Sequence, residues 1–249
     1  MAHLGRTSGT TLGRTLGRIP GPGRALGTIG LTSRAREVER VAAAPAPHRR
    51  PDPALLLGEL AGWAGAARLW AASPRLALAP RGDGSVVIDL PGWRAPELTG
   101  LPIRTYLRSL GHDARSWGLG TNTGRPTRDV ALLAADVREV AAARGPVSLV
   151  GWSLGGLIAR EVARREPDAV RRVVTYGSPV RLGRRLGTGT PIRVPVTAVL
   201  SRRDGVVDWR ACLDRTSPDV RHVEVGSTHL GLGVDPDVWR VVAEALAGR

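Results

Sequence analysis

The fold is decided by the stretch Val147-Ser148-Leu149-Val150-Gly151-Trp152-Ser153-Leu154-Gly155-Gly156-Leu157-Ile158. The apolar run over residues 147–151 predicts a buried strand, and residues 154–165 predict a helix that follows it directly. So abrupt a turn needs small residues on both sides, and Gly151 and Gly155 flank Ser153 there. The pattern G-x-S-x-G can arise by chance in a chain with 32 glycines. Its position between a strand and a helix is therefore the informative part.

Strands and helices alternate on both sides of this junction. Short apolar runs predict further strands over residues 85–90, 113–119, 173–176, 196–200 and 223–225. Apolar residues at helical spacing predict helices near 97–110, from 127 to 141, and over 236–246, the last with Asp235 as N-cap and Pro236 at its first position. Such alternation requires right-handed crossovers, so we expect an α/β fold: a mostly parallel sheet with helices on both faces.

Ser153 is a candidate nucleophile because of its place in this turn. A sharp turn strains the serine backbone, lifts Oγ above the sheet edge and places it at a helix N-terminus, where the helix dipole favours negative charge. A serine hydroxyl is nevertheless a poor nucleophile at neutral pH. Acyl transfer needs a base to take its proton, an acid to orient that base, and donors for the oxyanion.

The candidate acid and base follow later strands. Asp204 comes after the strand over residues 196–200, and we expect it to orient the base; its rival Asp208 is interpreted as the N-cap of a helix. Among five histidines, His229 alone is expected at the C-terminal end of a strand, whereas His222 is expected before its strand, at the opposite edge of the sheet. The order Ser153, Asp204, His229 is one in which catalytic triads occur.

Two backbone amides are candidate oxyanion donors. The N–H of Leu154 follows the serine, and the N–H of Trp93 lies in the loop Leu90-Pro91-Gly92-Trp93 after an earlier strand. Loss of one such donor costs about 2.7–4 kcal/mol of transition-state stabilisation. An ordinary turn is the alternative interpretation of Pro91-Gly92.

Five motifs together resemble bacterial α/β-hydrolases related to lipases and to the deacylase that remodels glycolipid anchors. The motifs are 90–93, 118–124, 151–161, 176–179 and 201–207, and the similarity spans roughly residues 85–247. The resemblance implies the α/β-hydrolase fold, a serine esterase or lipase mechanism, and no metal or organic cofactor. Trp152 stands where many relatives have His, a change that we expect to be tolerated because the side chain packs beside the nucleophile.

One region departs from the lipase pattern. Many lipases have a helical lid where this chain offers only a short connection between Pro179 and Pro195, with Arg181, Arg184 and Arg185. We therefore expect a minimal lid and an open site, assisted by an amphipathic surface helix over residues 53–72. The arginines are interpreted as a solvated loop, and recognition of an anionic acyl donor stays open as the alternative.

The N-terminal segment differs in composition from the rest of the chain. Residues 1–52 carry nine arginines against three acidic residues and little apolar mass, so we expect a disordered basic tail before a catalytic domain over residues 53–249. The net charge is +14, and all 36 basic residues are arginine, which suggests codon bias. Weak association of the tail with an anionic membrane surface is the functional alternative. Cys212 is the only cysteine, and neither a signal peptide nor a membrane span is evident, which favours the cytoplasm.

Three functions remain open at this point. Hydrolysis of a small-molecule or lipid ester leads, and acyl transfer through the same acyl-enzyme differs from it only in how the pocket handles water. A non-catalytic binding protein, or a nucleic-acid protein, is the third. No zinc-ligand spacing, phosphate-binding loop or alternation of aromatic and basic residues supports nucleic-acid binding, so no nucleic acid is expected.

Overall fold

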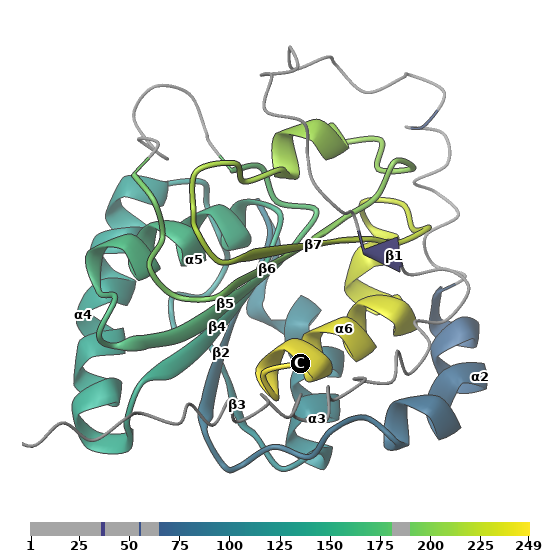
Figure 1. Ribbon diagram of the computed structural model, residues 1–249, viewed down its shortest axis with the longest axis horizontal. Coiled ribbons are helices and arrows are strands. Elements are labelled where there is room, and N and C mark those ends of the chain that lie inside the picture. The colour runs from purple at the N-terminus through teal and green to yellow at the C-terminus, as the bar shows by residue number, and fades with distance from the viewer. Residues whose placement is uncertain (1–35, 38–54, 56–64, 181–189) are drawn as a thin grey trace, which may run out of the picture. The chain divides into compact units, whose positions relative to one another are not determined.

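The computed structural model describes residues 36–37, 55, 65–180 and 190–249. Within these residues, seven strands form one sheet in the order β1-β7-β6-β5-β4-β2-β3 (Figure 1). Strands β2 to β7 pair in parallel, and β1 pairs antiparallel with β7 at the edge. The strands are β1 (Arg36–Glu37), β2 (Val86–Leu90), β3 (Asp113–Ser116), β4 (Val147–Trp152), β5 (Val170–Tyr176), β6 (Val196–Leu200) and β7 (Val220–Glu224).

Helices cover both faces of this sheet. Figure 1 shows α4 (Pro126–Arg144) and α5 (Leu154–Arg165) on one side, with α2 (Gly65–Ala77), α3 (Leu101–Ser109) and α6 (Pro236–Leu246) on the other. Strand β2 serves both layers, because successive side chains point to opposite faces. Ile88 packs in the core under α4 and α5, whereas Val87 packs in the core under α3 and α6. Each fully buried aliphatic side chain of this kind contributes about 1.5–3 kcal/mol.

The predicted mostly parallel α/β architecture is confirmed, and several boundaries differ. The predicted helix near 97–110 is a 3₁₀ turn, η2 (Glu97–Gly100), followed by α3. The predicted strand over 113–119 ends at Ser116, and α2 continues past Ala72 to Ala77. The caps are as predicted: Asp235 caps α6, and Asp208 caps η3 (Trp209–Cys212).

Some predictions lie outside the described residues. These are the disordered tail, the domain boundary at residues 52 and 53, the first part of the helix over 53–72, and most of the short connection after Pro179. Among the described helices, none is long and apolar enough to cross a membrane.

Parallel pairing places the carboxyl ends of β2, β4, β6 and β7 at one edge of the sheet. The loop with Trp93 follows β2, Ser153 follows β4, Asp204 follows β6, and His229 follows β7. Open α/β sheets bind their ligands at this edge.

Candidate active site

Ser153 occupies a strained turn between β4 and α5. Its backbone has φ 52° and ψ −122°, a region that residues with a side chain rarely enter. The turn closes because its neighbours lack side chains. A Cβ on Gly151 would lie 2.5 Å from Gly156 Cα, and one on Gly155 would lie 2.4 Å from the Leu90 carbonyl oxygen. The glycines therefore let the strand, the helix and the loop after β2 approach within contact distance.

The structure brings Ser153, His229 and Asp204 into one hydrogen-bonded series. His229 Nε2 lies 3.1 Å from Ser153 Oγ, and His229 Nδ1 lies 2.7 Å from Asp204 Oδ2. His229 and Asp204 are both buried. With the carboxylate accepting from Nδ1–H, Nε2 is left without a proton and faces the serine hydroxyl, the tautomer that a general base requires.

Asp204 is held by its own loop. Its second oxygen, Oδ1, accepts hydrogen bonds from the amides of Val206 (2.8 Å) and Val207 (2.7 Å). Those two bonds fix the plane of the carboxylate, so that Oδ2 is directed at His229. They also distinguish Asp204 from Asp208, whose carboxylate accepts from Arg210 N at the start of η3.

Two residues that sequence reasoning did not assign position this series. Gly177 has φ +57°, and a Cβ there would lie 3.1 Å from His229 Nδ1 and 3.2 Å from Asp204 Oδ2. Ser201 Oγ donates to the Ser227 carbonyl at 2.5 Å, which joins the loop that carries Asp204 to the loop that carries His229. Gly177 lies in a motif quoted from the sequence, but only the fold shows what it faces.

The predicted oxyanion loop lies against the nucleophile turn. Gly155 packs on the Leu90 and Pro91 carbonyls, so the loop with Trp93 adjoins the start of α5. Within the described part of the chain, the amides of Leu154 and Trp93 donate to no protein acceptor. Buried Asn122 also holds this loop, because its Nδ2 donates a hydrogen bond to the Pro91 carbonyl at 2.9 Å. The Leu154 amide directly follows the serine, and the role of the two amides as oxyanion donors stays a prediction.

A cavity of about 410 Å³ lies beside the series, at the lower end of the usual range for ligand sites. Its walls include Trp152 and Leu230, the chain neighbours of Ser153 and His229, together with Leu90 and Pro91 of the oxyanion loop. The Trp152 and His229 rings lie 5.5 Å apart between centroids, so the tryptophan packs beside the predicted base. Within the described residues, no group of His, Cys, Asp and Glu has the arrangement to hold a metal ion.

Comparison with known proteins places this arrangement in a known fold. The structure is similar to a metagenome-derived lipolytic enzyme from the work on LipS and LipT (TM-score 0.55, 14% identity, 69% of this chain and 95% of that one). It is also similar to MGS-MChE2, an alpha/beta hydrolase from a lagoon-sediment metagenome (TM-score 0.52, 17% identity, 68% and 93%). The chain has the α/β-hydrolase fold.

Further comparisons add little about the substrate of this chain. Est1E from Butyrivibrio proteoclasticus, solved with ferulic acid bound, has a TM-score of 0.52 at 15% identity, over 66% of this chain and 87% of that one. No protein family model matches. The bifunctional biotin biosynthesis protein BioHC of Teredinibacter turnerae is 28% identical over 105 residues, which is 40% of this chain and only 18% of that protein. The likeness to Est1E shows the fold alone, and neither comparison implies a substrate for this chain.

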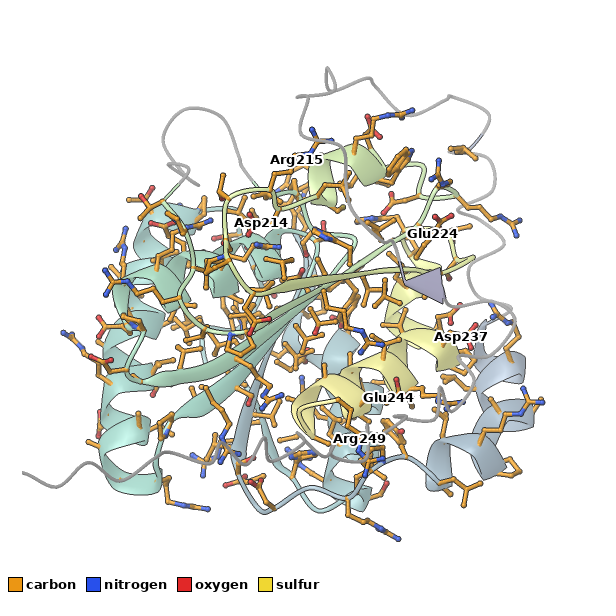
Figure 2. All side chains as sticks on the ribbon, viewed as in Figure 1. Asp214, Arg215, Glu224, Asp237, Glu244 and Arg249 are labelled. Carbon is orange, nitrogen blue, oxygen red and sulfur yellow. The ribbon has the colours of Figure 1, made fainter. Side chains whose placement is uncertain are left out.

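The prediction that His222 precedes its strand is wrong. His222 lies inside β7, because pairing with β6 begins at Val220 and extends the strand over the polar residues Arg221 and His222. Its buried ring does not lie at the sheet edge: Nε2 accepts a hydrogen bond from the amide of Asp214 at 3.0 Å. Figure 2 shows Asp214 beside Arg215 on the connection from η3 to β7.

His222 gives a pH dependence to stability. Burial, with the nearby Arg160 charge, lowers the pKa of His222 from 6.5 to about 4. Between those values the unfolded chain binds a proton that the folded chain does not, so stability is retained above pH 6.5 and falls as the pH drops towards 4. We expect the wild-type Tm to fall over this window more steeply than that of His222→Gln, whose amide oxygen can still accept from Asp214. Parallel Tm profiles for the two proteins would contradict this assignment.

Proposed function

We propose that the chain is a serine hydrolase that cleaves carboxylic esters through an acyl-enzyme. The observation that carries the proposal is the buried His229 ring, hydrogen-bonded to Ser153 Oγ on one side and to Asp204 on the other. Similarity to esterases and lipases at low identity supports the fold for this chemistry and leaves the ester itself to experiment.

In the proposed mechanism, Nε2 of His229 takes the Ser153 proton as Oγ attacks the ester carbonyl carbon. The tetrahedral oxyanion accepts hydrogen bonds from the amides of Leu154 and Trp93. Asp204 stabilises the imidazolium, which then protonates the leaving alcohol as the bond between the carbonyl carbon and the alcohol oxygen breaks. Water, deprotonated by His229, attacks the acyl-enzyme, and the carboxylic acid leaves as the proton returns to Ser153.

The strained serine backbone has a role in this scheme. A residue held at positive φ persists only when the surrounding structure fixes it, and here tightly packed glycines fix it. Oγ is therefore presented to the substrate with little reorganisation. The N-terminus of α5, directly behind it, favours the negative charge that develops during attack.

Fluorophosphonate labelling combined with p-nitrophenyl esters of graded chain length tests the proposal. We expect the wild type to be labelled on the peptide that contains Ser153 and to hydrolyse at least the short esters. Ser153→Ala should lose both properties. Ser109→Ala, at the C-terminal end of α3 and the opposite edge of the sheet, is the matched control and should keep both. Labelling that persists in Ser153→Ala would refute the assignment.

A further inference from the structure

The cavity beside Ser153 is mainly apolar, and Asp89 is its charged lining residue, with Thr99 and Tyr176 as further polar ones. Asp89 is on β2, and its side chain points to the same face as Val87, towards α3. There its Oδ2 accepts from Arg104 Nη1 at 2.8 Å, and both side chains are buried. The same Arg104 Nη1 donates to the Glu97 carbonyl at 2.9 Å. The Asp89 side of a buried ion pair therefore lines a mainly apolar cavity.

The pairing of Asp89 is one-sided. Its Oδ2 is enclosed by Arg104 and Gly100; a Cβ on Gly100 would lie 1.7 Å from this oxygen. Among the described residues, no hydrogen-bond donor contacts Oδ1, although Asp89 is only 2% exposed. A purely structural buried carboxylate is expected to have both oxygens satisfied. Since Asp89 lines the cavity, the remaining acceptor position is available to a ligand.

Tyr176 adds a second polar group to the same wall. It is buried at the end of β5 and lines the cavity with Asp89. Burial, with the negative charge of Asp89, raises the pKa of its phenol well above 10, so the hydroxyl stays neutral and can donate. Burial also raises the pKa of Asp89 to about 6, against the lowering effect of Arg104. Above that pH the cavity holds a carboxylate acceptor close to a phenol.

The net charge of the Asp89–Arg104 pair decides which kind of ligand group can bind beside Asp89. The Asp89 carboxylate and the Arg104 guanidinium cancel, so the pair is neutral as a unit. A cationic amine would leave a net charge in a buried apolar site, which is strongly disfavoured. A neutral hydroxyl can donate to Oδ1 without adding charge. The rest of the wall, including Leu90, Trp152 and Leu230, suits an apolar body.

We propose, resting on the proposed function, that the cavity binds an apolar part of the ester whose far end carries a hydroxyl. This hydroxyl donates a hydrogen bond to Asp89 Oδ1. Asp89 is then a specificity-determining residue, and the substrates are esters of hydroxylated aryl or alkyl groups. Hydrogen bonds to charged groups discriminate strongly in buried sites, because the unsubstituted analogue leaves the acceptor unpaired.

Matched ester pairs test this proposal. The p-nitrophenyl esters of (p-hydroxyphenyl)propanoic and (p-tolyl)propanoic acids differ by hydroxyl against methyl, as do those of ω-hydroxyoctanoic and nonanoic acids. We expect wild-type kcat/KM to favour the hydroxyl member of at least one pair by about tenfold or more. In Asp89→Asn the amide oxygen should face Arg104 and the NH₂ group the cavity, so this preference should fall to about twofold or less. Asp113→Asn, which alters a half-buried Asp–Arg pair on β3, should keep the wild-type ratio.

A binding measurement separates the two proposals. In a Ser153→Ala background, which cannot form an acyl-enzyme, calorimetric Kd values for the methyl esters of the same acids should show the same hydroxyl preference, lost in Ser153→Ala with Asp89→Asn. Removing both partners, Asp89→Leu with Arg104→Leu, should also abolish the preference without leaving a buried charge unpaired. Equal Kd values within each pair, or a preference that survives the Asp89 changes, overturn the inference. Selective binding without any ester turnover would support the inference and count against the proposed hydrolase.

Discussion

His229→Ala is expected to lower kcat for ester hydrolysis by about 10⁴-fold or more, with little change in KM. Without the imidazole, no described group lies within hydrogen-bond distance of Ser153 Oγ to take its proton. Ser153→Ala should reduce kcat to the same residual rate. Steady-state kinetics on a short p-nitrophenyl ester, with a folded-state check by circular dichroism, measure both losses.

The combined variant makes this expectation sharper. When residues act as one catalytic unit, the rate losses caused by their single substitutions do not add. The double variant Ser153→Ala with His229→Ala should therefore be no slower than either single variant. His222→Ala is the matched control. In the wild type, the His222 ring on β7 accepts a hydrogen bond from the Asp214 amide and takes no part in the proposed chemistry. Additive losses in the double variant, or a larger loss for His222→Ala than for His229→Ala, would show that the assigned base is wrong.

The sequence was sufficient for features that are local or follow from strand order. The turn at Ser153 was evident because Gly151 and Gly155 flank it between an apolar run and a helical pattern. Asp204 and His229 could be selected because parallel strands bring their carboxyl ends to one edge, which needs only the order of the strands. The N-caps Asp208 and Asp235 were likewise visible as local patterns.

Features that depend on pairing between distant segments were not accessible in the same way. The start of β7 is set by its register with β6, and the polar residues Arg221 and His222 carry no local sign that the strand includes them. Gly177 and Ser201 acquire their roles only once the loops after β5, β6 and β7 are side by side. The partner of Asp89 is 15 residues away on another element, and nothing local in Ile88-Asp89-Leu90 identifies it. Each of these contacts is decided by tertiary packing.

Asp214→Asn is expected to lower the free energy of unfolding by about 3–5 kcal/mol. Arg160, on helix α5 after Ser153, and Asp214 have fully buried side chains whose Nη1 and Oδ2 atoms lie 2.8 Å apart. Burial raises the pKa of Asp214, but the Arg160 charge and bonds from Thr216 and Ser217 outweigh it, and the net pKa is below its ordinary range. In Asp214→Asn, Oδ1 can still accept from Thr216 and Ser217, but the NH₂ group replaces the oxygen that accepts from Arg160. The substitution therefore removes the negative charge and leaves the buried Arg160 guanidinium facing a second donor without its counter-ion.

Urea denaturation measures the cost of leaving one buried charge unpaired. The four proteins compared are the wild type, Asp214→Asn, Asp214→Asn combined with Arg160→Met, and Asp83→Asn. Combining Arg160→Met with Asp214→Asn removes both charges and should recover most of the stability lost in Asp214→Asn, because the penalty comes from one uncompensated charge. Asp83→Asn breaks an exposed pair with Arg171 and should change stability by no more than about 1 kcal/mol. If Asp214→Asn were as stable as the wild type, Arg160 would have to find another acceptor within α5 and its neighbours. If the combined variant were no more stable than Asp214→Asn, the loss would come from the turn that Asp214 forms with Thr216 and Ser217. The ion pair would then not be what holds α5 to the loop before β7.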